Sequence, residues 1–212
     1  MVGLVIVSHS AALADGVMEL AREMGGGEVA IVTAGGMDGG ALGTDAELVR
    51  QAVERVRSPD GVLVLMDLGS ALMSAEMAVE MAAADGGPIL LSEAPLVEGA
   101  VAAAALAGAG ASLAEVAREA RGALRIKTVQ LGVEEREREQ APPAEEDRGS
   151  AVELRLRVHN RLGLHARPAA RFVRALAGLD ARVEVSNASR GRGPADGRSL
   201  TALSTLAVGH GD

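Results

Sequence analysis

The segment VGLVIVSHS, residues 2–10, decides how the first half of the sequence is interpreted. Its run from Val2 to Val7 is almost continuously apolar, which is typical of a strand buried on both faces of a sheet. Three more runs of this kind follow, and each is succeeded by a helical pattern. The strands are expected at residues 2–7, 29–33, 62–66 and 88–91, and the helices at 11–24, 45–57, 71–84, 97–107 and 112–125. This alternation predicts a doubly wound, mainly parallel α/β domain over residues 1–130.

Residues 131–150 interrupt this regularity. The stretch EEREREQAPPAEEDRGS, residues 134–150, is charged, contains two adjacent prolines and has almost no apolar side chain. Such a segment buries too little apolar surface to offset the entropy of ordering it. We interpret it as a linker between two domains.

Residues 151–212 have the pattern of a smaller α+β domain. Apolar and charged residues alternate from Val152 to Val158, which predicts a strand with one solvated face. A helix is expected at Ala166 to Leu176, with Pro168 in its first turn, where a missing N–H costs little. The remaining elements are a short strand at residues 182–185, a loop at 187–197 and a short helix at 199–206 capped by Ser199.

The composition excludes several classes of function. The chain has no cysteine, tryptophan or tyrosine and a single phenylalanine, which argues against disulfides, thiolate catalysis and base stacking. Its net charge of -8 opposes nucleic-acid phosphates. No apolar run is long enough for a signal sequence or a membrane span, so we expect a cytoplasmic protein without nucleic-acid or membrane partners.

His9 is the first candidate for chemistry. It follows the first predicted strand, and ligands of open parallel sheets bind beyond the carboxyl ends of the strands. A neutral imidazole nitrogen can accept a phosphoryl group. Asp67, at another strand end, could fix the imidazole tautomer, while Thr44, Ser70 and the helix start at Gly69 could receive phosphoryl oxygens. From position alone, a capping or packing role for His9 fits equally well.

His165 is the second candidate. It lies just before the predicted helix at Ala166, whose unpaired N–H groups and positive dipole end favour a bound oxyanion. Arg167 can add charge-assisted hydrogen bonds. The alternative is that His165 is only a helix-start residue. The four scattered histidines lack the spacing of a zinc site, so we expect neither a metal nor a cofactor.

The motifs VSHS, GTDA, MDLGSA and APLVEGA, in this order over residues 1–125, resemble the mannose-type IIA domain of the phosphotransfer subunit of bacterial phosphoenolpyruvate-dependent dihydroxyacetone kinases. The resemblance implies that His9 is phosphorylated on its tele nitrogen and passes the phosphoryl group to ADP on the ADP-binding subunit. It also implies a homodimer formed through this domain.

The segment NRLGLHARPAARFV, residues 160–173, resembles the active-site signature of HPr, the histidine-containing phosphocarrier. This implies that His165 is phosphorylated on its pros nitrogen by enzyme I, and that free HPr is an alternative donor to His9. Ser199 matches the regulatory serine of some HPr proteins. An HPr open-faced sandwich has a further strand and helix beyond the point that this sequence reaches, so we expect a partial domain that is poorly stable alone.

Two alternatives to a relay toward dihydroxyacetone kinase stay open at this point. A mannose-type IIA component can serve a sugar permease instead. A non-enzymatic regulator would hold its phosphate on His9 and change partner binding, whereas a carrier must lose it rapidly to ADP.

Overall fold

The computed structural model describes residues 1–82, 86–131, 152–161 and 163–212. Its first part contains four parallel strands: β1 (Gly3–Ser8), β2 (Ile31–Gly35), β3 (Val62–Met66) and β4 (Ile89–Ser92). They form one sheet in the order β2-β1-β3-β4, and every pairing is parallel. The predicted parallel α/β fold is therefore confirmed.

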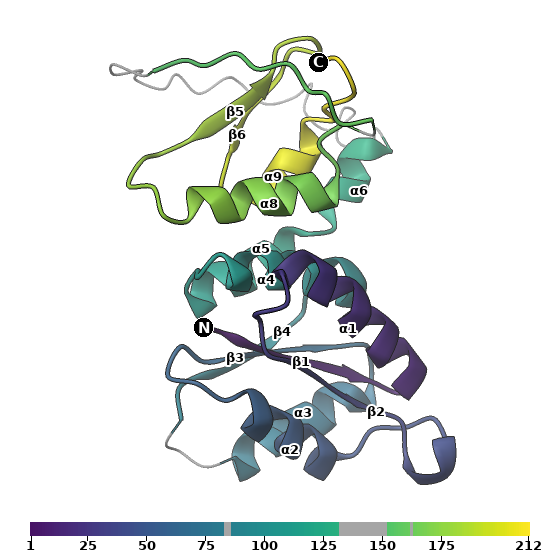
Figure 1. Ribbon diagram of the computed structural model, residues 1–212. Coiled ribbons are helices and arrows are strands. Elements are labelled where there is room, and N and C mark those ends of the chain that lie inside the picture. Colours follow the sequence, from purple (N-terminus) through teal and green to yellow (C-terminus); the bar gives the residue numbers. More distant parts are fainter. Residues whose placement is uncertain (83–85, 132–151, 162) are drawn as a thin grey trace, which may run out of the picture.

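Helices cover both faces of this sheet (Figure 1). One face carries α1 (Ala11–Gly25), α4 (Leu96–Gly108) and α5 (Leu113–Gly122), and the other carries α2 (Ala46–Val56) and α3 (Ser70–Met81). Successive residues of β1 point to opposite sides, so Leu4 and Ile6 enter one apolar cluster while Val5 and Val7 enter the other. Burial on both faces explains why β1 and β3 are apolar at almost every position.

Polar residues set the starts of several helices. The Ser10 hydroxyl accepts a hydrogen bond from the Leu13 N–H at 3.3 Å, and the Asp45 carboxylate accepts one from the Glu47 N–H at 2.7 Å. Ser112 and Glu115 form a capping box. The helix expected at 112–125 ends at Gly122 and is followed by a separate short helix, α6 (Arg125–Gln130). A 3₁₀ turn, η1 (Asp38–Gly40), lies in the glycine-rich loop.

The second part contains α8 (Ala166–Leu176), β5 (Glu184–Asn187), β6 (Arg192–Asp196) and α9 (Leu200–Thr205). The helix at 166–176 matches the prediction, and Ser199 caps α9 by accepting from the Ala202 N–H at 2.9 Å. Strands β5 and β6 form an antiparallel hairpin. The prediction of a loop over residues 187–197 was therefore wrong at β6. Gly193 and Pro194 are typical of loops, but proline is also tolerated on an edge strand.

The strand predicted at Val152–Val158 was also wrong, since these residues have no regular secondary structure. Among the described residues, this segment pairs only at its end, where the Val158 N–H donates to the Asp212 carbonyl and the Gly211 N–H donates to the Val158 carbonyl. Leu154 and Leu156 are 76% and 73% exposed. An alternating pattern forms a strand only when its backbone can pair with a neighbouring strand and its apolar side chains can pack against an apolar layer.

The two parts pack against each other through one continuous apolar cluster. Helix α8 buries Ala169 and Val173, and α9 buries Leu200 and Leu203, in the same cluster as Leu106 of α4. Figure 1 shows α8 and α9 lying over the α4 and α5 layer. The expected linker, residues 131–150, lies outside the described residues except for Leu131.

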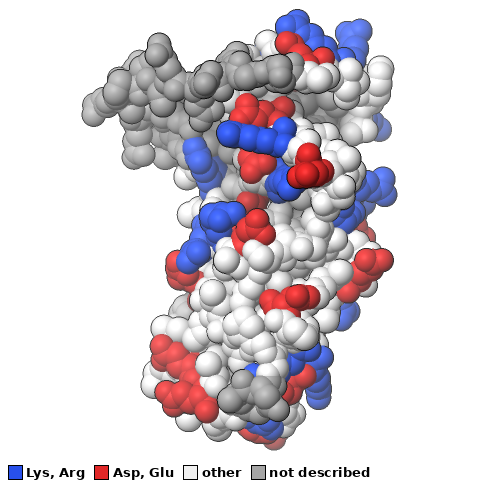
Figure 2. All heavy atoms as spheres, turned by 90° about the vertical axis from the view of Figure 1, so that its left-hand side faces the viewer, with Lys and Arg blue, Asp and Glu red and all other residues white. Residues whose placement is uncertain are grey.

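Charged side chains of both signs are intermixed on the face of the molecule seen in Figure 2. Within the described ranges, no helix is both long enough and apolar enough to cross a bilayer.

Candidate functional site

The first candidate site lies where the sheet changes winding direction. The chain leaves β1 toward β2 on one side, while β3 pairs with β1 on the other side. His9 follows β1 and Asp67 follows β3, and the Asp67 N–H donates to the Val7 carbonyl at 3.1 Å. Crevices at such a switch point are the usual ligand sites of doubly wound sheets.

Asp67 holds His9 in one orientation. Its Oδ1 atom lies 2.9 Å from His9 Nδ1, and its Oδ2 atom accepts the His9 backbone N–H at 2.8 Å. The hydroxyl of buried Ser8 donates to Oδ2 at 2.9 Å. A carboxylate is only an acceptor, so it selects the tautomer with the proton on Nδ1 and leaves the Nε2 lone pair available.

The surroundings of Asp67 keep it ionised. Burial disfavours the charge, but hydrogen bonds from the backbone N–H groups of His9 and Leu68, from the Ser8 hydroxyl and from the His9 ring outweigh it. The pKa of Asp67 is therefore below the ordinary carboxyl value. The acceptor role of Asp67 toward His9 consequently persists at neutral pH.

A chain of hydroxyl groups begins at the other ring nitrogen. The Ser70 Oγ atom lies 2.9 Å from His9 Nε2 and 3.4 Å from Thr44 Oγ1, and Thr44 Oγ1 lies 2.9 Å from Ser74 Oγ. The His9 side chain is 31% exposed, so a donor can reach Nε2 from solvent. The Ser70 hydroxyl is thus the one next to Nε2, and Thr44 and Ser74 extend a chain of hydroxyl contacts from it.

The amino-terminus of α3 adds a favourable field at the same place. Ser70 is its first residue, and Gly69 is the N-cap with a φ of 57°, a backbone conformation that favours glycine. The positive end of the helix dipole therefore faces Nε2. The Gly43 N–H donates to the His9 carbonyl at 2.9 Å, which joins the glycine-rich loop to the site.

The structure thus brings together five of the residues singled out in the sequence, His9, Thr44, Asp67, Gly69 and Ser70. Two further members of the site were missed, Ser8, which holds Asp67, and Ser74, which holds Thr44. The spacing of Ser74, one helical turn after Ser70, was the available signal.

His165 is exposed and forms the N-cap of α8, as the sequence indicated, without a side-chain capping bond. Arg167 does not stand free beside it. Its guanidinium pairs with Glu23 Oε2 of α1 at 2.9 Å. Ser199 is likewise engaged with the first part of the chain, because its hydroxyl lies 2.8 Å and 2.9 Å from the two carboxylate oxygens of Glu119.

His9 and His165 are not brought together. His9 precedes the amino end of α1, whereas Arg167, two residues after His165, contacts Glu23 near its carboxyl end. Ala11 and Glu23 are twelve residues apart on α1, which corresponds to roughly 18 Å of helix. Figure 1 shows α8 lying over the carboxyl end of α1, which is remote from the carboxyl end of β1. Direct transfer requires the reacting atoms to approach to about 3–3.5 Å.

Among the described residues, no group of three or more His, Asp or Glu side chains is arranged to hold a metal ion. The chemistry available at the His9 site is that of a nucleophilic imidazole nitrogen with hydroxyl donors and a helix amino-terminus around it.

Comparison with known proteins agrees with this reading of the fold. Residues 3–117 match the EIIA-man family model, described as the fructose IIA component of phosphotransferase systems, and residues 152–212 match the model of the HPr phosphorylation site. A crystal structure of an unknown-function protein, 35% identical, matches 57% of this chain and 94% of that chain with a TM-score of 0.52.

Three relatives are named as the phosphoryl donor or phosphotransferase subunit DhaM of a dihydroxyacetone kinase. The protein of Providencia stuartii is 40% identical over 100% of this chain and 45% of its own length. That of Escherichia coli is 43% identical over 85% of this chain and 39% of its own length. That of Lactococcus lactis is 37% identical over 52% of this chain and 85% of its own length.

The parallel sheet is thus that of a phosphotransferase-system IIA protein of the EIIA-man class, followed here by an HPr segment. Within that class, the chain belongs to the family of DhaM phosphoryl donor subunits of dihydroxyacetone kinase. It spans less than half the length of the Providencia and Escherichia relatives.

Proposed function

We propose that this chain is a phosphohistidine carrier that receives a phosphoryl group on His9 Nε2 and delivers it to ADP bound on a partner subunit of dihydroxyacetone kinase. The observation that carries the proposal is the pair of contacts on one imidazole ring. Asp67 engages Nδ1 at 2.9 Å, and Ser70 is the neighbour of Nε2 at 2.9 Å. The ring is therefore oriented as a nucleophile.

Phosphorylation follows from this geometry as an in-line displacement. The Nε2 lone pair forms a bond to phosphorus while the phosphorus–nitrogen bond of the donor phosphohistidine breaks and its electron pair returns to the donor ring. Nδ1 keeps its proton, so the phosphorylated ring becomes cationic, and the adjacent Asp67 carboxylate stabilises it. The hydroxyls of Ser70 and Thr44 and the start of α3 are placed to stabilise the phosphoryl oxygens.

Discharge is the reverse displacement with another nucleophile. A β-phosphate oxygen of ADP on the partner forms a bond to phosphorus while the bond to Nε2 breaks. The exposed edge of His9 is compatible with direct contact between the two proteins. We further propose enzyme I and HPr as the upstream partners, with His165 as an internal donor assisted by Arg167, and a homodimer through the first part of the chain.

The test is acid-labile phosphate incorporation from phosphoenolpyruvate, enzyme I and HPr into wild type, His9→Ala and His165→Ala, followed by addition of the ADP-binding subunit. We expect ADP and the partner to remove the label from the wild type within seconds. In His9→Ala, label remains on His165 only and the partner does not remove it, whereas His165→Ala takes label on His9 from free HPr. Label that persists despite the ADP-binding subunit would identify a regulator instead. Discharge by a sugar permease but not by the ADP-binding subunit would assign the chain to sugar transport.

A further inference from the structure

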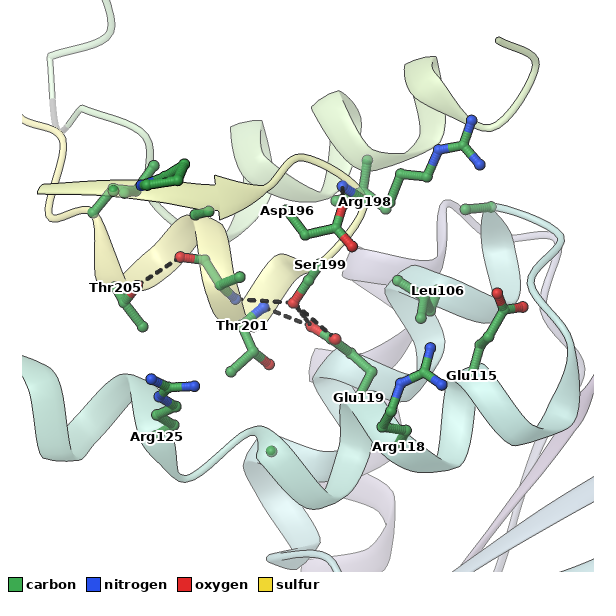
Figure 3. A pocket seen from close by; sticks show the side chains of 18 of the residues that line it. Leu106, Glu115, Arg118, Glu119, Arg125, Asp196, Arg198, Ser199, Thr201 and Thr205 are labelled. Atoms are coloured by element: carbon green, nitrogen blue, oxygen red, sulfur yellow. Dashed lines mark hydrogen bonds between the residues drawn. The ribbon is translucent and has the colours of Figure 1, made fainter. Parts of the chain in front are cut away.

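The contact between the two parts of the chain is built around one buried carboxylate. Glu119, on α5, is 9% exposed, and its Oε2 atom accepts the Ser199 hydroxyl at 2.8 Å. Its Oε1 atom accepts the Thr201 backbone N–H at 2.6 Å. Figure 3 shows the Glu119 side chain directed at Ser199 and Thr201, at the start of α9. A side chain of the first part thus completes the amino-terminus of a helix of the second part.

A second point of contact lies at α8. The Arg174 guanidinium donates to the Met24 carbonyl at the end of α1, and Arg167 pairs with Glu23 one residue earlier. These polar contacts flank the apolar cluster in which Val173 and Leu200 pack against Leu106. We use the term docked arrangement for the state defined by the Glu119, Arg174 and Arg167 contacts.

The docked arrangement is incompatible with transfer between the two histidines of one chain. It fixes α8 over the carboxyl end of α1, while His9 precedes the amino end of the same helix. The length of helix between them is several times the approach distance that an in-line transfer requires.

The interface also has features of a separable contact. Beside Glu119 lies a cavity of about 830 Å³, lined by Arg118, Arg125 and Arg198 and by Ser199 and Thr201. The Thr201 hydroxyl is buried there without a hydrogen-bond partner among the described residues. The cavity and the unpaired hydroxyl weaken an interface that the apolar cluster otherwise stabilises, so the polar contacts of Glu119 have a large share in holding it closed.

We propose that the docked arrangement is a resting state in which Glu119 holds the second part of the chain away from the His9 site, and that intramolecular relay requires its release. This inference rests on the proposed function for its relay step, whereas the docking itself is independent of phosphotransfer. Glu119 is a positioning residue, since it contacts neither histidine in the described structure.

The variants are Glu119→Ala, which removes the carboxylate, and Arg174→Ala, which removes the second contact without touching α5. The matched control is Glu54→Gln on α2, which loses an ion pair with Arg57 on the opposite face of the sheet. The sequence contains no cysteine, so Arg55→Cys and Leu179→Cys place one spin label on each part of the full chain. Both positions are exposed.

Distances between the labels are measured by pulsed electron paramagnetic resonance. We expect one narrow distribution in the wild type and in Glu54→Gln, and a broad, longer one in Glu119→Ala and Arg174→Ala. Unchanged distributions in both variants would overturn the proposal.

The second readout is transfer from His165 to His9, with enzyme I and phosphoenolpyruvate but no free HPr, at chain concentrations low enough that the rate is independent of concentration. We expect the rate of this transfer to rise roughly tenfold or more in Glu119→Ala. The variant loses the charge-assisted hydrogen bonds to a buried carboxylate that stabilise the docked arrangement. Broadened distances without faster transfer would overturn the resting-state claim. If His165 takes no label in any variant, the relay through His165 fails, and the distances alone decide whether Glu119 holds the docked arrangement.

Discussion

Asp67 Oδ1 lies 2.9 Å from His9 Nδ1, and this pair joins the ends of two neighbouring parallel strands. The relationship explains why an exposed imidazole can act as an oriented nucleophile. The carboxylate fixes the ring tautomer, and the parallel sheet fixes the carboxylate, so little ordering is needed when a phosphoryl donor arrives.

Replacing Asp67 by Asn should lower the rate of His9 phosphorylation. An amide oxygen can still accept from Nδ1, but without the charge that stabilises the cationic phosphorylated ring. Loss of a charge-assisted hydrogen bond costs about 1.5–3 kcal/mol, which corresponds to roughly ten- to a hundredfold in rate. The measurement is the rate of label transfer from phosphorylated HPr, with thermal melting to verify folding. A rate equal to that of the wild type would show that Asp67 has only a structural role.

The free energy of unfolding at acidic pH should depend on the ionisation of the Asp67 carboxylate. Because the pKa of folded Asp67 is below its unfolded value, its ionisation stabilises the folded state above the unfolded pKa of about 3.9, and this contribution is lost as pH falls through the folded-state pKa. The difference in unfolding free energy between wild type and Asp67→Asn should be constant from neutral pH to about pH 5 and should shrink at lower pH. A difference that grows on acidification contradicts the assigned direction.

Ser70→Ala should have a smaller effect than Asp67→Asn. The hydroxyl is a neutral hydrogen-bond donor, worth about 0.5–1.5 kcal/mol, so transfer to and from His9 should slow by roughly two- to tenfold. Ser58→Ala is the control, since Ser58 donates to the Met1 carbonyl at a distance from the site. Equal transfer rates for the two variants would show that the Ser70 hydroxyl does not take part in the transfer step.

Helix α3 should form part of the homodimer interface. Met73, Met77 and Met81 are 64%, 53% and 48% exposed and follow one another at four-residue spacing, so they form an apolar stripe on the surface. Met73→Glu with Met77→Glu would place unpaired carboxylates in that interface and should give a monomer by sedimentation velocity. Leu20→Glu on α1, where Leu20 is 50% exposed, is the control. A dimer that survives the double change would locate the interface elsewhere.

The sequence was most informative where local pattern and tertiary environment agree. Continuous apolar runs fit strands buried on two faces, and Ser199 caps the short helix α9 as expected. The position of His9 at a strand end, together with Asp67 at the neighbouring one, also followed from the order of elements.

The failures concern long-range pairing. The alternation at Val152–Val158 carries no information about whether a partner strand is present. Gly193 and Pro194 are typical loop residues, so the sequence did not indicate β6. The contact of Glu119 with Ser199 links residues 80 positions apart, and no local pattern marks it. It also changes the interpretation of Ser199, whose hydroxyl both caps α9 and binds the first part of the chain.

The central claim is that His9 accepts the phosphoryl group on Nε2, and its most direct test is long-range proton–nitrogen NMR of the phosphorylated chain labelled with ¹⁵N-histidine, with His9→Ala to assign the ring. We predict phosphorus–nitrogen coupling at Nε2 of His9, with Nδ1 still protonated. A phosphoryl group on Nδ1, or no change in the His9 ring under conditions that label the chain, would contradict this account.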